Sequence, residues 1–192
     1  MKKDTRSMLI SAAAELLDQG GPASVTLREV GKRAGVSHNA PYKHFESKDN
    51  LLAAVAAREL ERMSETMDMS GGGKVTIAAV RRVLRAYIDW ARTYPARFHL
   101  TFGPLPGADA ALKTTAGESR KLLVELVGAA QKAELLPGAN ADRMASLLQA
   151  LAHGAADLAL NGHLSATGKG QAEPEDLIDD LLRYLRASAG KP

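Results

Sequence analysis

Hydrophobic residues recur every three or four positions along most of this 192-residue chain. Near the N-terminus, for example, this spacing places Leu9, Ala13 and Leu17 on one face of a helix. No segment shows the sustained alternation of polar and apolar residues that predicts a β-strand. The sequence therefore predicts an all-α fold of about nine helices. Besides three helices between residues 26 and 69, they are expected over 5–19, 75–94, 96–102, 109–135, 140–160 and from Pro174 onward.

Capping residues mark two short helices near the N-terminus. Thr26 and Glu29 match the capping box, in which a hydroxyl and a carboxylate each accept a hydrogen bond from an amide at a helix start. The helix that begins there is expected to end at Gly35, because glycine adopts positive φ without a Cβ penalty. Ser37 is then predicted to cap a second short helix.

The second short helix combines a buried face with a polar edge. Pro41 lies in its opening turn, where a missing amide costs least, and Phe45 follows one turn later on the same buried face. Two short helices joined by a glycine turn predict a helix-turn-helix, whose second helix has the size to enter the DNA major groove. Ser47 is predicted to cap a long helix from residue 48 to about 69.

Positive charge is concentrated at the N-terminal end of the chain. Up to and including Lys48 there are eight Lys or Arg against five Asp or Glu, whereas the rest of the chain has 17 of each. The whole net charge of +3 therefore lies in the segment that contains the helix-turn-helix. This asymmetry favours a polyanionic partner, although charge alone would also fit a solvated basic surface.

Four segments of this region are distinctive in combination: Thr26–Val30, Ala34–Ser37, Tyr42–Phe45 and Ser47–Leu52. Together they resemble the DNA-binding domain of TetR/AcrR transcriptional regulators. In addition, His153-Gly154, in a run that ends at Leu160-Asn161-Gly162, is similar to a C-terminal regulatory domain named for a Trp-His-Gly motif, with Ala152 in place of the tryptophan. The resemblance implies a DNA-binding domain over residues 1–50, a ligand-binding and dimerisation domain over 51–192, and the helix 48–69 as the linker between them.

A helix that reads DNA needs some side chains that reach phosphates and others that reach base edges. The residues expected at phosphates, where the family resemblance also places contacts, are Thr26, Tyr42, His44 and Lys48, and Ser37 is expected to contact DNA as well. Asn can bond an adenine edge at two points, Lys can bond guanine acceptors, and a small methyl can meet thymine. The residues expected at bases are Arg28, His38, Asn39, Ala40 and Lys43.

Three of these residues have structural alternatives. Asn39 could support the cap of its own helix, and His44 could pack against the first helix instead of a phosphate. Arg28 could be solvated or pair with an acid on the surface. Pro41 also lies where bulky aliphatic residues are common in the resembled family. The start and the tilt of this helix could therefore differ from those in the family.

One helix-turn-helix buries too little surface for specific binding, so two are expected to act together in a homodimer on a palindromic operator. The last two predicted helices are rich in leucine and small residues and are expected to form the dimer interface as part of a four-helix bundle. A helix that is apolar on more than one side can also serve the core of its own protomer. The predicted interface residues are Leu147, Leu151, Ala155, Leu158, Ile178, Leu181, Leu182 and Leu185.

Aromatic and polar-tipped side chains gather in the second half of the chain. They predict a pocket for a small apolar or aromatic effector, with core packing as the alternative. The predicted ligand-binding residues are Tyr87, Trp90, Phe98, Phe102, Leu126 and His153. An effector that binds one arrangement of the dimer better than another would release the protein from DNA.

Other classes of function lack support in the sequence. Cysteine is absent, the five histidines are scattered, and there is neither a glycine-rich phosphate loop nor a metal-spaced cluster, so we expect no catalysis, metal or cofactor. No apolar stretch approaches the roughly 18 residues of a membrane span, and we expect a cytoplasmic protein. The sequence predicts a transcriptional repressor. The alternative is a helical ligand carrier or protein-binding module that does not bind DNA.

Overall fold

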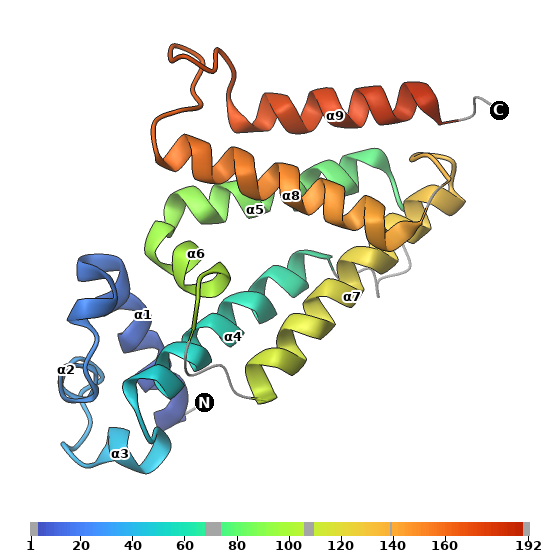
Figure 1. The fold of residues 1–192 in the computed structure, drawn as a ribbon. Helices are drawn as coiled ribbons and strands as arrows, with labels where there is room; N and C mark the ends of the chain where they lie inside the picture. The colour runs from blue at the N-terminus through green and yellow to red at the C-terminus, as the bar shows by residue number, and fades with distance from the viewer. Residues whose placement is uncertain (1–3, 68–73, 106–109, 139, 190–192) are drawn as a thin grey trace. The chain divides into compact units, whose positions relative to one another are not determined.

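A computed structural model describes residues 4–67, 74–105, 110–138 and 140–189. Over these ranges the protein is entirely helical, with nine α-helices and no strand, which confirms the predicted fold class (Figure 1). None of the described helices combines the length and the apolar character that a membrane crossing requires. The helices are α1 (Thr5–Ser24), α2 (Leu27–Arg33), α3 (Ala40–His44), α4 (Lys48–Met67), α5 (Ile77–Thr93), α6 (Pro95–Phe102), α7 (Ala110–Lys132), α8 (Ala141–Leu160) and α9 (Pro174–Ser188).

The chain divides into two compact units, and each unit is built from two separate stretches of sequence. The first, named the head below, comprises Met1–Arg62 and Tyr94–Gly117. The second, named the body, comprises Met63–Thr93 and Glu118–Pro192. The head therefore contains α6 in addition to the helix-turn-helix. The functional boundary at residue 50 stays a prediction.

The core of the head is formed by apolar faces of α1, α2, α4 and α6. Leu9, Leu17 and Val30 are fully covered, as the helical spacing of the N-terminal sequence predicts. Phe45 and Leu100 join the same cluster, so α6 closes a core that begins at the N-terminus. Burial of these side chains, at about 25 cal/mol per Å² of apolar surface, is the main driving force for assembling the short helices.

A buried ion network holds α6 against α1 and α4. Arg97 of α6 is 7% exposed, and its Nε lies 3.0 Å and 3.1 Å from the two carboxylate oxygens of Asp18. Its Nη1 lies 3.2 Å from Oε1 of Glu59, which is only 1% exposed. Arg62 reaches the same carboxylate from the surface at 3.2 Å, and the Arg97 guanidinium stacks 4.2 Å from the centroid of the Tyr94 ring.

The charge on Arg97 is stabilised by its partners. Burial by itself lowers the pKa of a guanidinium, but the hydrogen bonds that Arg97 donates to Asp18 and the negative charge of Glu59 outweigh burial and raise the pKa of Arg97. Two carboxylates around one cation also satisfy most of the fork-shaped donors of arginine. The network therefore places a permanent buried charge at the junction of three helices of the head.

The body packs α5, α8 and α9 against one another. The apolar residues that repeat at helical spacing along α5 face the core, since Val80, Leu84 and Ala91 are buried. At the edges of the contact with α9, Arg85 Nη2 donates to Asp179 at 2.8 Å and Arg92 pairs with Glu175 at 3.2 Å. Separately, Arg120 of α7 fastens that helix to α8 through the Asp142 carbonyl, Ser146 and Gln149.

Helix boundaries follow most of the predicted caps. The side chains of Thr26 and Ser47 each accept a hydrogen bond from the backbone amide three residues later, as predicted, and Asn140 caps α8 in the same way. The predicted cap at Ser37 is wrong: α3 begins at Ala40, and Ser37 accepts the Ala40 amide through its backbone carbonyl instead. The predicted helix end near residue 69 and the predicted start at residue 109 lie outside the described residues.

Candidate nucleic-acid interface and effector site

The turn between α2 and α3 depends on a glycine. Gly35 has φ of +67°, a conformation that costs other residues about 1–2 kcal/mol. The Gly35 amide donates to the Lys32 carbonyl and the Val36 amide to the Gly31 carbonyl, so the last carbonyls of α2 are satisfied as the chain reverses. The glycine predicted to end the first short helix therefore has the expected conformation.

The two helices of the motif approach each other unusually closely. A Cβ atom built on Gly31 of α2 would lie 2.8 Å from Cγ of Pro41 in α3. Both residues are buried. The absence of a side chain at Gly31 thus sets the spacing between α2 and α3, and with it the position of the polar edge of α3.

That polar edge is open to solvent. Tyr42 is 54% exposed, Lys43 and His44 are also exposed, and the His38 and Tyr42 rings stack with centroids 6.0 Å apart. Exposure of His44 argues against the alternative that it packs on α1. Asn39 is exposed and makes no side-chain capping bond to α3, which leaves its amide group available.

The remaining predicted contact residues surround α3. Arg28 and Ser37 are exposed, Ala40 is half-buried, and the exposed Thr26 uses its hydroxyl to cap α2. Lys48 is half-buried, and its ammonium donates a hydrogen bond to the Pro22 carbonyl. An ammonium has three N–H donors. This bond therefore orients the Lys48 side chain and uses only one of the three donors.

In the body, three of the predicted effector residues lie together. The Tyr87 hydroxyl and Nδ1 of His153 are joined by a hydrogen bond of 2.8 Å, and the Tyr87 and Trp90 ring centroids are 6.1 Å apart. Burial raises the pKa of the Tyr87 phenol, which therefore stays neutral at physiological pH. All three side chains are half-buried.

The other predicted effector residues are placed differently. Leu126 is fully buried on α7. Phe98 and Phe102 belong to the head, where their ring centroids lie 5.8 Å apart and Phe98 is buried. The predicted set thus divides into a polar-aromatic cluster in the body and an aromatic pair in the head.

The predicted dimer interface also separates into two groups. Leu147 and Leu158 of α8 are 47% and 46% exposed, and Leu151, Leu181 and Leu185 are half-buried. In contrast, the remaining three predicted interface residues are buried within the protomer, because they face its own core. They are Ala155, Ile178 and Leu182. Tyr184 of α9, which is not among the predicted interface residues, is 65% exposed. Its position three residues after Leu181 is the pattern that could have identified it.

Two family descriptions match the chain. Residues 9–55 match "Bacterial regulatory proteins, tetR family", and residues 80–185 match "Tetracyclin repressor-like, C-terminal domain". The first match contains α2, the glycine turn and α3. The second contains the Tyr87–His153 cluster and most of the leucine-rich face of α8 and α9.

Individual relatives agree with this assignment. HTH-type transcriptional regulator Rv1816 of Mycobacterium tuberculosis is 29% identical over 131 residues, which cover 64% of this chain and 56% of that protein. HTH-type transcriptional repressor KstR of Rhodococcus jostii is 37% identical over 62 residues, 32% of this chain and 29% of that protein. A structure of a protein of unknown function from Rhodococcus sp. RHA1 superposes with a TM-score of 0.81, at 26% identity, over 98% of this chain and 96% of that one.

The chain thus matches only a little more than half the length of the Mycobacterium relative, while its fold is shared with the Rhodococcus structure along nearly its whole length. The family description of the C-terminal domain by itself accounts for residues 80–185, more than half of the chain. Together with the helix-turn-helix match at residues 9–55, this establishes that the protein belongs to the TetR family of bacterial transcription regulators.

Proposed function

We propose that this protein is a homodimeric transcriptional repressor that binds a palindromic operator and is released from it by a small apolar or aromatic effector. The observation that carries the proposal is the polar edge of α3. It holds Asn39, Tyr42 and Lys43 open to solvent on a helix that a glycine turn and a buried proline hold in place. Repression is favoured because it requires only that the dimer occupy the promoter, and the relative KstR is named a repressor.

In this proposal two sets of side chains have different tasks. Asn39, Lys43 and Arg28 read base edges, since amide, ammonium and guanidinium groups match the donors and acceptors of the major groove. Tyr42 and Lys48 bind phosphates and set the register of α3. The hydrogen bond from Lys48 to the Pro22 carbonyl limits the motion of the ammonium before DNA arrives.

Substitution of Asn39 and of Lys48 is expected to separate the two tasks. Asn39→Ala should cost about 1–3 kcal/mol on the operator and relax the preference at one base position. Lys48→Ala should weaken every duplex alike and reduce the salt dependence by about one phosphate contact. The measurement is a footprint on an inverted repeat upstream of the gene or its neighbour, followed by titrations of that duplex and of a scrambled duplex at two salt concentrations.

The scrambled duplex serves as the control for base reading. If Asn39→Ala weakened operator and scrambled DNA by the same factor, Asn39 would not read a base. If the unaltered protein bound neither duplex, or bound DNA without any loss of affinity as salt rises, the DNA-binding proposal itself would fail.

The proposed dimer interface is the exposed face of α8 and α9. Leu147, Leu151, Gly154 and Leu158 fall on one stripe of α8, at intervals of three or four residues. A Cβ on Gly154 would meet nothing within 4 Å in the protomer. A glycine between exposed leucines, with open space above it, is suited to the close approach of a second α8.

Gly154→Arg is expected to give a monomer with an intact fold. Arginine is a better helix former than glycine by roughly 1 kcal/mol, so the isolated helix should gain stability. A charged side chain in an apolar interface should nevertheless prevent pairing and, with it, operator binding. Sedimentation velocity and thermal melting measure the two effects.

Gly117→Arg is the matched control, because Gly117 is exposed on a helix and, like Gly154, has nothing within 4 Å of its Cβ position. This variant should remain dimeric and bind DNA as the unaltered protein does. A dimeric Gly154→Arg protein would show that the interface lies elsewhere.

The proposed effector site includes the cluster of Tyr87, Trp90 and His153. Two aromatic rings and a hydrogen-bonded hydroxyl–imidazole pair offer both apolar surface and a polar anchor, the usual composition of a small-molecule site. An effector would act only through its preference for one arrangement of the dimer over another.

A further inference from the structure

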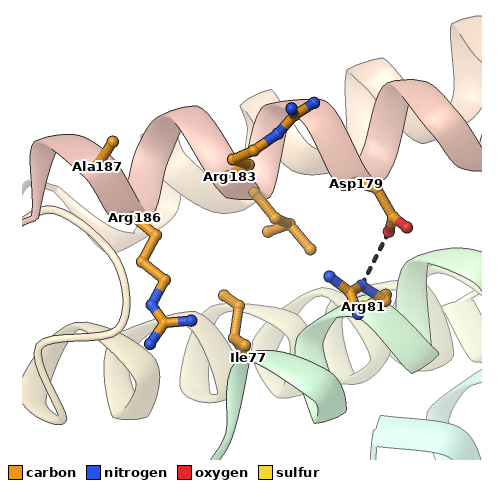
Figure 2. A pocket seen from close by; sticks show the side chains of 7 residues that line it. Ile77, Arg81, Asp179, Arg183, Arg186 and Ala187 are labelled. Atoms are coloured by element: carbon orange, nitrogen blue, oxygen red, sulfur yellow. Dashed lines mark ion pairs between the residues drawn. The ribbon is translucent and has the colours of Figure 1, made fainter.

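A groove of about 490 Å³ lies between α5 and α9, entirely within the body (Figure 2). This volume falls within the range of sites for small ligands. Ile77 of α5 and Leu182 and Ala187 of α9 supply the apolar part of its lining. It shares none of its lining residues with the Tyr87–His153 cluster.

The charged part of the lining carries more positive than negative charge. Asp179 is the acid of the groove, and it is shared between Arg81 and Arg85, each with a nitrogen 2.8 Å from a carboxylate oxygen. Within the described residues, the Arg81 Nε and the Asp179 Oδ1 have no hydrogen bond of good geometry, so the ion pair satisfies them only in part. One carboxylate therefore serves two guanidiniums.

Arg186 adds a further positive charge. Its side chain extends from α9 toward α5 and ends beside Ile77 (Figure 2). The part of the chain that the structure describes offers it neither an ion pair nor a side-chain hydrogen bond. Arg183 differs, because it forms an ion pair with Asp180 of its own helix, and its guanidinium points away from Ile77.

We infer that this groove binds an anionic amphiphile, a molecule with one carboxylate or phosphate group and a short apolar tail. The head group would lie between Arg186 and Arg81, because planar guanidiniums bind carboxylate and phosphate oxygens in pairs. The tail would cover Ile77 and Ala187. Such a molecule supplies the negative charge that the groove lacks and the apolar surface that its lining matches.

Calorimetric titration of the full chain with decanoate, decyl phosphate and decanol tests this inference. We expect at least one of the two anions to bind, and decanol to bind about tenfold more weakly because it leaves Arg186 without a charged partner. Comparison of the two anions identifies the head group that the groove prefers. No DNA is present, so failure here would leave the proposed DNA binding untouched.

Two arginine variants locate the binding site. Arg186→Gln should weaken binding of the preferred anion about tenfold, while Arg183→Gln, on the same helix but outside the head-group position, should leave it unchanged. Both residues are exposed, and equal melting temperatures would verify that both variants fold. Equal affinity of Arg186→Gln and the unaltered protein, equal losses in the two variants, or no binding of either anion would overturn the inference.

Discussion

An Arg97→Ala variant is expected to lose about 3–5 kcal/mol of unfolding free energy, the usual cost of leaving a buried charge without its partner. Glu59 is 1% exposed and would lose its buried partner, while the more distant Arg58, at 4.0 Å, and the surface residue Arg62 would remain. Asp18 would lose its bonds to the guanidinium. Urea unfolding followed by circular dichroism, at one fixed protein concentration because a dimer is expected, measures the loss.

Arg62→Ala is the matched control. Arg62 contacts the same carboxylate oxygen of Glu59 at the same 3.2 Å, but its side chain is 52% exposed. Solvent screens such a pair, so its removal should cost less than about 1 kcal/mol. Joint replacement of Arg97 and Glu59 by leucine should recover much of the loss, since the fully buried carboxylate is then removed together with its partner. Equal losses of unfolding free energy in Arg97→Ala and Arg62→Ala would contradict the expectation that burial makes the Arg97 ion pair the stronger one.

Gly31→Ala is expected to weaken operator binding about tenfold or more, the typical cost of losing one base contact. The added methyl would lie 2.8 Å from Cγ of Pro41. A proline ring cannot turn aside as a flexible side chain can, so α3 has to shift relative to α2. Stability should change little, because alanine's gain of roughly 1 kcal/mol in helix propensity offsets part of the 1–3 kcal/mol cost of overpacking.

A double substitution distinguishes this displacement from a general loss of structure. Pro41→Ala removes the ring atoms that the new methyl would meet, so adding Gly31→Ala to it should cause almost no further loss of operator affinity. The operator titration described for Asn39→Ala provides the measurement. Losses that simply add would mean that the two sites are independent, contrary to their contact.

Local features of the fold could be predicted because their causes are local. A cap such as Thr26 or Asn140 acts on an amide three residues away, and the apolar stripe of α5 repeats within a single helix. Gly35 likewise adopts its positive φ because of a turn within its own motif. The open edge of α3 follows from the same patterns.

Long-range features could not be predicted in this way. Arg97 meets Asp18 across 79 residues and Glu59 across 38, and no periodicity in the sequence connects them. The contact between Gly31 and Pro41 likewise depends on how two helices cross. The Ser37 cap failed because its backbone carbonyl, rather than its hydroxyl, accepts the Ala40 amide. Phe98 and Phe102 could not be assigned to the head, since helical spacing does not say which core a helix joins.

Because α6 belongs to the head, the position of its codons affects how regulator genes can recombine their DNA-binding and effector-binding segments. Leu100 and Arg97 complete a core that begins at the N-terminus, yet they are encoded after the whole of α5. A single crossover that transplants the first 50 codons would leave this core open and would separate Asp18 from Arg97. Recombination of the DNA-reading part with a new sensor therefore requires two separate gene segments to travel together, which restricts how new specificities can arise in this lineage.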